Sequence, residues 1–231
     1  MTREPRDGEV EILSRLYQRR FSETEAERKN GIWRVICEHL QRYVDPNQPV
    51  LDIGCDRGDF IRNIAAREKW ATDLRDVSAS LGGTIKFVQC NGLDVANALP
   101  RNHFGTVFMS NYLEHLVDSD AVLEQVTASY AVTRPGGRVV ILQPNIRLVH
   151  EAYWDFIDHR VAITDKSLRE ACEAAGYRSE RIVVRFLPYT TKSPLPQSDW
   201  LIRAYLQFAP ARWLLGRQTL YVGVKQKSSD A

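Results

Sequence analysis

The chain has 231 residues, of which 44% are hydrophobic and 26% charged, a balance typical of one globular domain with a sizeable core. Its formal net charge is only +2 and no basic tail is present, so we expect no nucleic-acid partner. The sequence has no apolar signal core, no run near the roughly 18 apolar residues of a membrane span, and no Cys-x-x-Cys spacing, so we expect a cytoplasmic protein with reduced thiols.

Helical segments and short apolar segments alternate along the chain. Apolar spacing predicts helices over 8–20, 24–44, 60–66, 118–130 and 164–175, the last with Thr164 as its cap and Gly176 as its stop. Strands are predicted at 50–53, 69–72, 85–90, 106–110, 138–142, 182–186 and 220–224, with a turn over 134–137. This alternation predicts one α/β domain with a doubly wound, mostly parallel sheet. Two long, aromatic-rich insertions, 143–163 and 188–217, interrupt it, and such insertions usually carry function.

A glycine-rich turn follows the first predicted strand, in the segment Asp52-Ile53-Gly54-Cys55-Asp56-Arg57-Gly58. Gly54 allows the backbone to turn sharply and to approach a ligand without a Cβ in the way. The helix after it offers free N–H groups to an anion such as a carboxylate. Taken alone, the turn could equally serve a nicotinamide or flavin nucleotide, or be no more than a tight turn.

Carboxylates follow the next two predicted strands. Asp73 lies 21 residues after Asp52 and can accept hydrogen bonds from both hydroxyls of a ribose, although a solvated, loop-capping Asp is the alternative. In Asn91-Gly92-Leu93-Asp94, the carboxylate of Asp94 can accept from the amine of an adenine, and a simple Asn-Gly turn is the alternative.

Five segments in this order resemble class I S-adenosylmethionine-dependent methyltransferases: LDIGCDRGDF, WATD, NGLD, SNYLEHL and RPGGRVVI. The resemblance covers about residues 30–142 and continues more loosely to 224. It implies S-adenosylmethionine as the cofactor and a seven-stranded sheet whose last strand is antiparallel. It also divides the single domain 1–231 into N-terminal helices (1–45), a cofactor-binding half (46–142) and an acceptor-side half (143–231).

The resemblance assigns the cofactor-binding residues. By this resemblance, Asp52, Gly54 and Gly58 hold the methionine end of the cofactor, Asp73 holds the ribose and Asp94 holds the adenine. Asn111 and Tyr112 line the pocket near the sulfonium, and Cys55, Leu74 and Asn91 complete the set of cofactor-binding residues. One departure is Asp56, which stands where the family has a middle glycine. Because Asp adopts left-handed backbone angles less easily than glycine, the geometry of this turn is the point to check.

The remaining segments, among them ILQPNIR, YWDFIDHR and RFLPYTTKSPLP, resemble a bacterial branch of these enzymes associated with surface-polysaccharide and glycolipid gene clusters. This resemblance implies O-methylation of a sugar hydroxyl in a glycan, glycolipid or sugar-bearing metabolite. The alternatives are another small acceptor such as a quinone or polyketide, or a non-catalytic module that binds the cofactor. A nicotinamide-dependent oxidoreductase is disfavoured, because no Gly-x-Gly-x-x-Gly is present.

A hydroxyl acceptor gains from a base with a pKa near neutrality, which points to histidine. His159, in the first insertion, is our first candidate, with Asp155 or Asp158 to orient its ring, and His115 is the second. His39 is expected to be structural. We expect no metal, and the alternative is a magnesium site of Asp155, Asp158 and Asn145.

The second insertion carries an apolar helix face. Trp200, Ala204 and Phe208 have the spacing of one side of a helix. We interpret this face as core packing or as a lid. Peripheral contact with a lipid-linked acceptor or a membrane surface is the alternative.

Overall fold

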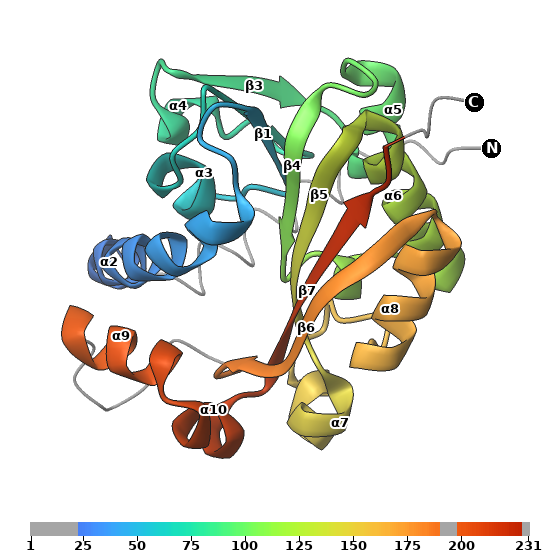
Figure 1. Cartoon of the computed structure of the whole chain (residues 1–231). Helices are drawn as coiled ribbons and strands as arrows, with labels where there is room; N and C mark the ends of the chain where they lie inside the picture. Colours follow the sequence, from blue (N-terminus) through green and yellow to red (C-terminus); the bar gives the residue numbers. More distant parts are fainter. Residues whose placement is uncertain (1–22, 190–197, 228–231) are drawn as a thin grey trace.

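The computed structural model describes residues 23–189 and 198–227, and these form one seven-stranded sheet with helices on both faces (Figure 1). The strand order is β3-β2-β1-β4-β5-β7-β6, and β7 alone runs antiparallel to its neighbours β5 and β6. The strands are β1 (Pro49–Ile53), β2 (Glu68–Asp73), β3 (Ile85–Gln89), β4 (Phe104–Ser110), β5 (Thr133–Pro144), β6 (Tyr177–Leu187) and β7 (Gln218–Lys225). This confirms the predicted α/β fold and its antiparallel last strand.

The strand order places the site. The chain proceeds from β1 outward to β3 and then returns to β4 on the other side of β1. In open α/β sheets, ligands bind at such a reversal, outside the carboxyl ends of the two strands that flank it. The glycine-rich turn after β1 and the segment after β4 therefore meet at this edge.

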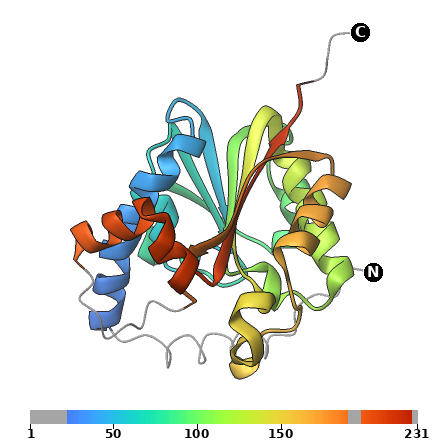
Figure 2. The ribbon, with the colours of Figure 1, turned by 60° about the horizontal axis from the view of Figure 1, so that its bottom comes forward.

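Helices cover the two faces of the sheet. They are α2 (Glu23–Leu40), α3 (Asp59–Asn63), α4 (Ser78–Leu81), α5 (Val95–Ala98), α6 (Ser119–Val132), α7 (Ile146–Val149), α8 (Asp165–Ala174), α9 (Asp199–Gln207) and α10 (Ala209–Leu215). The apolar core has two parts, one toward α2, α3 and α9 and the other toward α6 and α8. Figure 2 shows α9 beside α2, with α10 following α9, so the second insertion extends that face. In the described part of the chain, no helix is long and apolar enough to cross a membrane.

Most predicted boundaries hold to within a few residues, but β5 and β6 begin at Thr133 and Tyr177, well before the predicted starts at 138 and 182. The helix predicted at 60–66 ends at Asn63. The helix predicted at 8–20 lies outside the described residues. Residues 134–137 do not form a free turn but belong to β5, where the register against β4 shifts after Phe104. Gly136 takes a left-handed φ of 78°, so the glycines make an irregular start to the strand.

The helix predicted at 164–175 is confirmed as α8. The Thr164 hydroxyl accepts from the Ser167 N–H while the Ser167 hydroxyl accepts from the Thr164 N–H, a capping box that satisfies two free donors. Gly176 follows with a φ of 105°, which a residue with a Cβ would adopt only under strain. The end of the first insertion is thus fixed by local sequence.

Candidate active site

The turn between β1 and α3 has three successive bends. Gly54, Asp56 and Gly58 take left-handed φ angles of 68°, 48° and 74°. The N–H groups of Gly54 and Cys55 donate to the Thr72 carbonyl oxygen at 2.9 and 3.0 Å, which ties the turn to the end of β2. Asp56, which stands where the resemblance leads one to expect a glycine, thus takes a left-handed angle despite its Cβ.

Tyr112 fills the space that two glycines leave open. A Cβ on Gly54 would lie 2.5 Å from the Tyr112 ring, and one on Gly92 would lie 2.1 Å from its hydroxyl. That hydroxyl donates to Oε1 of the buried Gln125 at 2.9 Å. The space beside Gly54, which the sequence suggested was left for a ligand, holds the protein's own tyrosine. Tyr112 is therefore a wall between the glycine-rich turn and the segment after β3.

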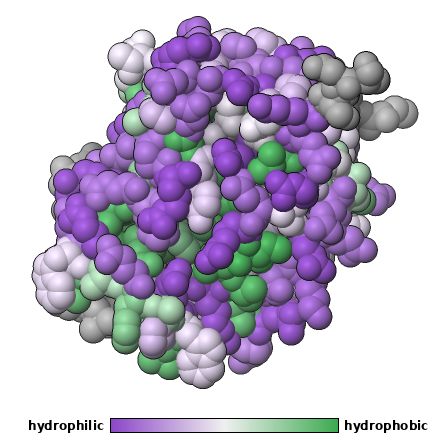
Figure 3. Space-filling view, in the orientation of Figure 1, coloured by the Kyte–Doolittle hydropathy of each residue, from purple (hydrophilic) through white to green (hydrophobic). Residues whose placement is uncertain are grey.

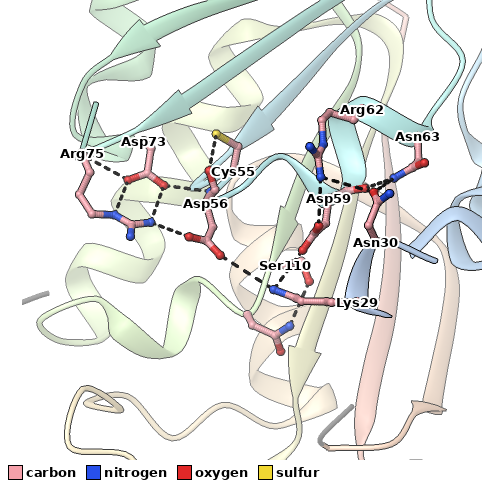
Figure 4. A network of polar contacts seen from close by, with 11 residues as sticks. Lys29, Asn30, Cys55, Asp56, Asp59, Arg62, Asn63, Asp73, Arg75 and Ser110 are labelled. Atoms are coloured by element: carbon pink, nitrogen blue, oxygen red, sulfur yellow. Dashed lines mark hydrogen bonds and ion pairs between the residues drawn. The ribbon is translucent and has the colours of Figure 1, made fainter. Parts of the chain in front are cut away.

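Asp73 lies at the end of β2 with its carboxylate fully engaged (Figure 4). Its Oδ2 accepts from the Asp56 N–H at 3.0 Å, and its Oδ1 accepts from the Arg75 N–H at 2.9 Å. The Arg75 guanidinium adds contacts of 3.2 and 3.3 Å and also donates to the Asp56 carboxylate at 2.9 Å. A ribose bound to Asp73 would therefore take over positions that the guanidinium now holds.

The N-terminal helix reaches the same turn through an ion pair. The Lys29 ammonium of α2 lies 3.1 Å from the Asp59 carboxylate and 3.9 Å from that of Asp56 (Figure 4). Asp52, next to last in β1, is buried, and burial together with nearby Asp59 raises its pKa well above the ordinary value. The carboxylates of Asp56 and Asp59 thus face cations, while that of Asp52 is enclosed by the core.

A polar cluster follows β4. Glu114 is completely buried, and its backbone oxygen accepts from the N–H groups of Arg160 and Val161 at 2.8 and 3.1 Å. These two bonds hold the first insertion against the segment after β4 and bring His159 to His115, with ring centres 5.0 Å apart. His115 Nε2 lies 3.9 Å from Glu114 Oε1. The residues predicted as catalytic therefore lie together.

Asp158 contacts the His115 ring. Nδ1 of His115 is 3.0 Å from the Asp158 carbonyl oxygen and 3.4 Å from its carboxylate. Burial lowers the pKa of His159, with the Glu114 carboxylate acting against it. Asp155, the other proposed partner of His159, is exposed.

The predicted magnesium alternative does not assemble. The Asn145 amide donates to Asp165 at 2.8 Å and to Thr219 at 3.2 Å, while its oxygen accepts from the Arg147 N–H. Because that side chain ties β5 to α8 and β7, it is not available beside Asp158 as a ligand.

A family profile described as a methyltransferase domain matches residues 14–181, well over half of the chain. The chain belongs to this methyltransferase-domain family. This confirms the predicted activity class and its cofactor, S-adenosylmethionine, which supplies an activated methyl group when bound.

Solved structures share the fold of this methyltransferase at low identity. An S-adenosylmethionine-dependent methyltransferase from Archaeoglobus fulgidus has a TM-score of 0.61 at 20% identity, covering 84% of this chain and 94% of its own. One from Mesorhizobium loti has 0.61 at 16%, covering 82% and 97%. Geranyl diphosphate C-methyltransferase from Streptomyces coelicolor, solved with Mg²⁺, geranyl diphosphate and S-adenosyl-L-homocysteine, has 0.56 at 14%, covering 83% and 78%. No curated protein matches the chain.

The other predicted cofactor residues surround the same edge of the methyltransferase sheet. Asn91 uses its side-chain oxygen to accept from the Leu93 N–H at 3.1 Å, so it caps its own turn. Asp94 and Leu74 are half-buried, and Asn111 is exposed at a left-handed φ of 48° just after β4. An acid after β2, another after β3 and a glycine-rich turn after β1 fit a methionine-linked nucleoside laid across these strand ends.

The sequence did not predict four residues of this site: Lys29, Arg75, Glu114, and Gln143, whose side-chain amide donates to Glu114 Oε2 at 2.9 Å. Arg75 carried a weak signal, since it follows Asp73 by two residues. Glu114 carried another, as an acid set among apolar residues directly before His115. Lys29 and Gln143 carried none, because their roles depend on partners far away in the sequence.

Proposed function

We propose that this methyltransferase transfers the methyl group of S-adenosylmethionine to a sugar hydroxyl of a glycan, glycolipid or sugar-bearing metabolite. The observation that carries the hydroxyl acceptor is a polar cluster in which buried Glu114 and Asp158 surround the half-buried histidines His115 and His159. The segment after β4 and the first insertion together form this cluster. A hydroxyl oxygen becomes a good nucleophile as its proton is lost, and a histidine of this cluster can accept that proton.

In this proposal the chain is one domain with two working halves. Residues 46–142 hold the cofactor, with Asp52, Gly54, Cys55 and Gly58 at its methionine end and Asp73 and Leu74 at its ribose. Asn91 and Asp94 lie at the adenine, and Asn111 and Tyr112 lie toward the sulfonium. Residues 143–231 hold the acceptor, which the first insertion brings to the methyl group. The enzyme mainly aligns the attacking oxygen with the methyl carbon and excludes water.

We assign activation of the hydroxyl to His159 and His115. Asp158 orients His115, since its carbonyl oxygen lies 3.0 Å from Nδ1 and leaves Nε2 directed to the cluster. The His159 Nδ1 is buried without a hydrogen-bond partner among the described residues, so it has a lone pair or a proton to offer an acceptor.

The assignment of a sugar as the acceptor rests on the resemblance of the second half of the chain to a branch associated with polysaccharide gene clusters. A lipid-linked acceptor is supported by exposed Trp200, Phe208 and Trp213 on α9 and α10. The cytoplasmic location belongs to the same proposal, and the four free cysteines suit a reducing compartment.

The test is mass spectrometry of candidate acceptors after incubation with S-adenosylmethionine and enzyme. The panel contains sugars, nucleotide sugars, glycolipids, and quinols as the competing class. We expect a single added methyl group on a sugar. His159→Ala and His115→Ala are expected to lower turnover by about 10²–10⁴-fold, with cofactor affinity within a few-fold of wild type.

His103→Ala is the matched control, since His103 packs on Trp70 and Phe104 at the opposite end of β4 and should keep wild-type turnover. Methylation of quinols but of no sugar would overturn the acceptor class. Cofactor binding without any transfer would favour the non-catalytic module.

A further inference from the structure

Three side chains of the cluster can meet at one point. The nearest ligand atoms of Glu114, His115 and His159 all lie within 4.8 Å of one another. We propose that these three residues bind one divalent transition-metal ion. The site goes beyond the expectation of a metal-free enzyme, and its existence does not depend on the identity of the acceptor.

The first argument is that buried atoms in the cluster lack partners. Glu114 Oε1 and His159 Nδ1 have no hydrogen-bond partner among the described residues, and the Glu114 side chain is completely buried. An unpaired carboxylate oxygen in the interior is strongly disfavoured, because burial removes its hydration. A cation beside Glu114 Oε1 and His159 Nδ1 would satisfy both atoms at once.

The second argument is that the surrounding groups orient the donors. The Gln143 amide donates to Glu114 Oε2 at 2.9 Å, which leaves Oε1 as the free oxygen of that carboxylate. The Asp158 carbonyl oxygen lies 3.0 Å from His115 Nδ1, which leaves Nε2 facing Glu114. Metal-binding histidines and carboxylates are commonly fixed in this way by a hydrogen bond at their other polar atom.

The donor set indicates the class of ion. Two imidazole nitrogens and one carboxylate oxygen suit zinc, cobalt, manganese or iron, whereas magnesium prefers oxygen donors. Ligand atoms about 2.0–2.2 Å from such an ion lie roughly 3.3–3.5 Å apart, so the cluster needs to contract by about 1 Å. Three protein ligands leave coordination positions open for a substrate oxygen.

During turnover the ion would help to activate the acceptor hydroxyl, a role that rests on the proposed function. The acceptor hydroxyl would bind the ion and lose its proton to water more readily. Its oxygen would form a bond to the methyl carbon as the carbon–sulfur bond breaks, and that electron pair would stay on the sulfur of the neutral product. With the ion bound, His115 and His159 would activate the hydroxyl indirectly, as ligands that hold the ion, and would not themselves accept the proton.

The experiment measures metal binding without any acceptor. Untagged protein, freed of metal with a chelator and dialysed, is titrated with Co²⁺ and followed by its visible absorption and by equilibrium dialysis. We expect one Co²⁺ per chain, binding at least tenfold weaker in Glu114→Gln and in His159→Asn, and unchanged in His103→Asn. Far-ultraviolet circular dichroism and thermal unfolding in chelator check that each variant is folded, and Co²⁺ should raise the melting temperature of wild type but not of Glu114→Gln.

The outcomes separate this inference from the proposed function. Wild-type protein that binds less than a tenth of an equivalent of Co²⁺, or a folded Glu114→Gln variant that binds it as wild type does, overturns the metal site. Methyl transfer to a sugar by such a metal-free enzyme would leave the proposed function intact. One bound Co²⁺ that depends on Glu114, in an enzyme that methylates no sugar, would support the metal site and refute the acceptor.

Discussion

At the scale of single residues, Asp56 explains how the turn keeps its shape without the middle glycine. A left-handed backbone angle costs a non-glycine residue on the order of 1 kcal/mol. Asp56 offsets this through its side chain, which contacts the Arg75 guanidinium at 2.9 Å and faces Lys29. The substitution thus adds ionic links from the turn to α2 and to the segment after β2.

Asp73→Ala is expected to weaken S-adenosylmethionine binding. Loss of two charge-assisted hydrogen bonds to the ribose costs about 2–4 kcal/mol. We expect the lower end, because the ribose replaces contacts that Arg75 makes in the free protein. Titration calorimetry measures the affinity, with the homocysteine product as a second ligand. Unchanged affinity in a folded variant would refute the ribose assignment, and binding of NADH instead would refute the whole site.

At the scale of elements, α2 is held by its apolar face and by one histidine. Trp33, Ile36 and Leu40 are buried in the core, and the His39 ring lies 5.5 Å from the Phe186 ring of β6. Burial, together with nearby Arg42 and Arg212, lowers the pKa of His39 to about 4. This agrees with the structural role expected for His39.

His39 should make the protein less stable in mild acid. Its pKa falls on folding from 6.5 to about 4, so the folded state binds the proton more weakly than the unfolded state does. The contribution is fully present above pH 6.5 and is lost as the pH falls toward 4. We expect about 1–2 kcal/mol, less than the whole shift implies, because the ring is partly exposed.

Urea unfolding of wild type and His39→Gln between pH 4 and pH 8 measures this difference. The variant should lose less stability than wild type on acidification. Equal losses in both proteins would show that the titration of His39 does not contribute.

At the scale of the whole molecule, α9 and α10 present an apolar surface to solvent. The exposed apolar side chains here are Trp200 on α9, Phe208 between the two helices, and Trp213, Leu214 and Leu215 on α10. Figure 3 shows apolar groups along its lower edge, where Figure 1 places α10. The Arg185 guanidinium lies 5.8 Å from the Trp213 ring centre, so cationic and aromatic groups meet at this surface. Aromatic and cationic groups together suit an anionic lipid interface.

We expect the protein to bind vesicles that contain anionic phospholipid. Trp213→Ala combined with Leu214→Ala should lower the vesicle partition coefficient at least tenfold, since each apolar side chain that enters the interface contributes up to roughly 1.5–3 kcal/mol and tenfold corresponds to about 1.4 kcal/mol. Sedimentation with vesicles measures it. Leu123→Ala is the control, because Leu123 is an exposed leucine on α6, far from α10 in the sequence. Absence of binding by wild type, or equal loss in the control, would contradict the lipid contact.

The sequence by itself determined the features that depend on neighbouring residues. Apolar runs and helical spacing located the strands and most helices, and Thr164 with Gly176 marked both ends of α8. The turn after β1 and the acids after β2 and β3 were also readable, because parallel strands bring their carboxyl ends to one edge in any such sheet. The predicted fold follows from these local signals, and the cofactor follows from the resemblance of the same segments to methyltransferases.

Only the tertiary structure decided which distant side chains meet. Tyr112 fills the space at Gly54 and Gly92, and Asp158, placed beside His159 by sequence, contacts His115. The cluster with Glu114 exists because backbone N–H groups 46 and 47 residues later bond to its carbonyl oxygen. Periodicity reports which face of its own element a side chain occupies, not the residue it will meet across a loop closure. The cluster of Glu114, His115 and His159 is divided between two distant segments, so no regular residue spacing in the sequence could indicate it.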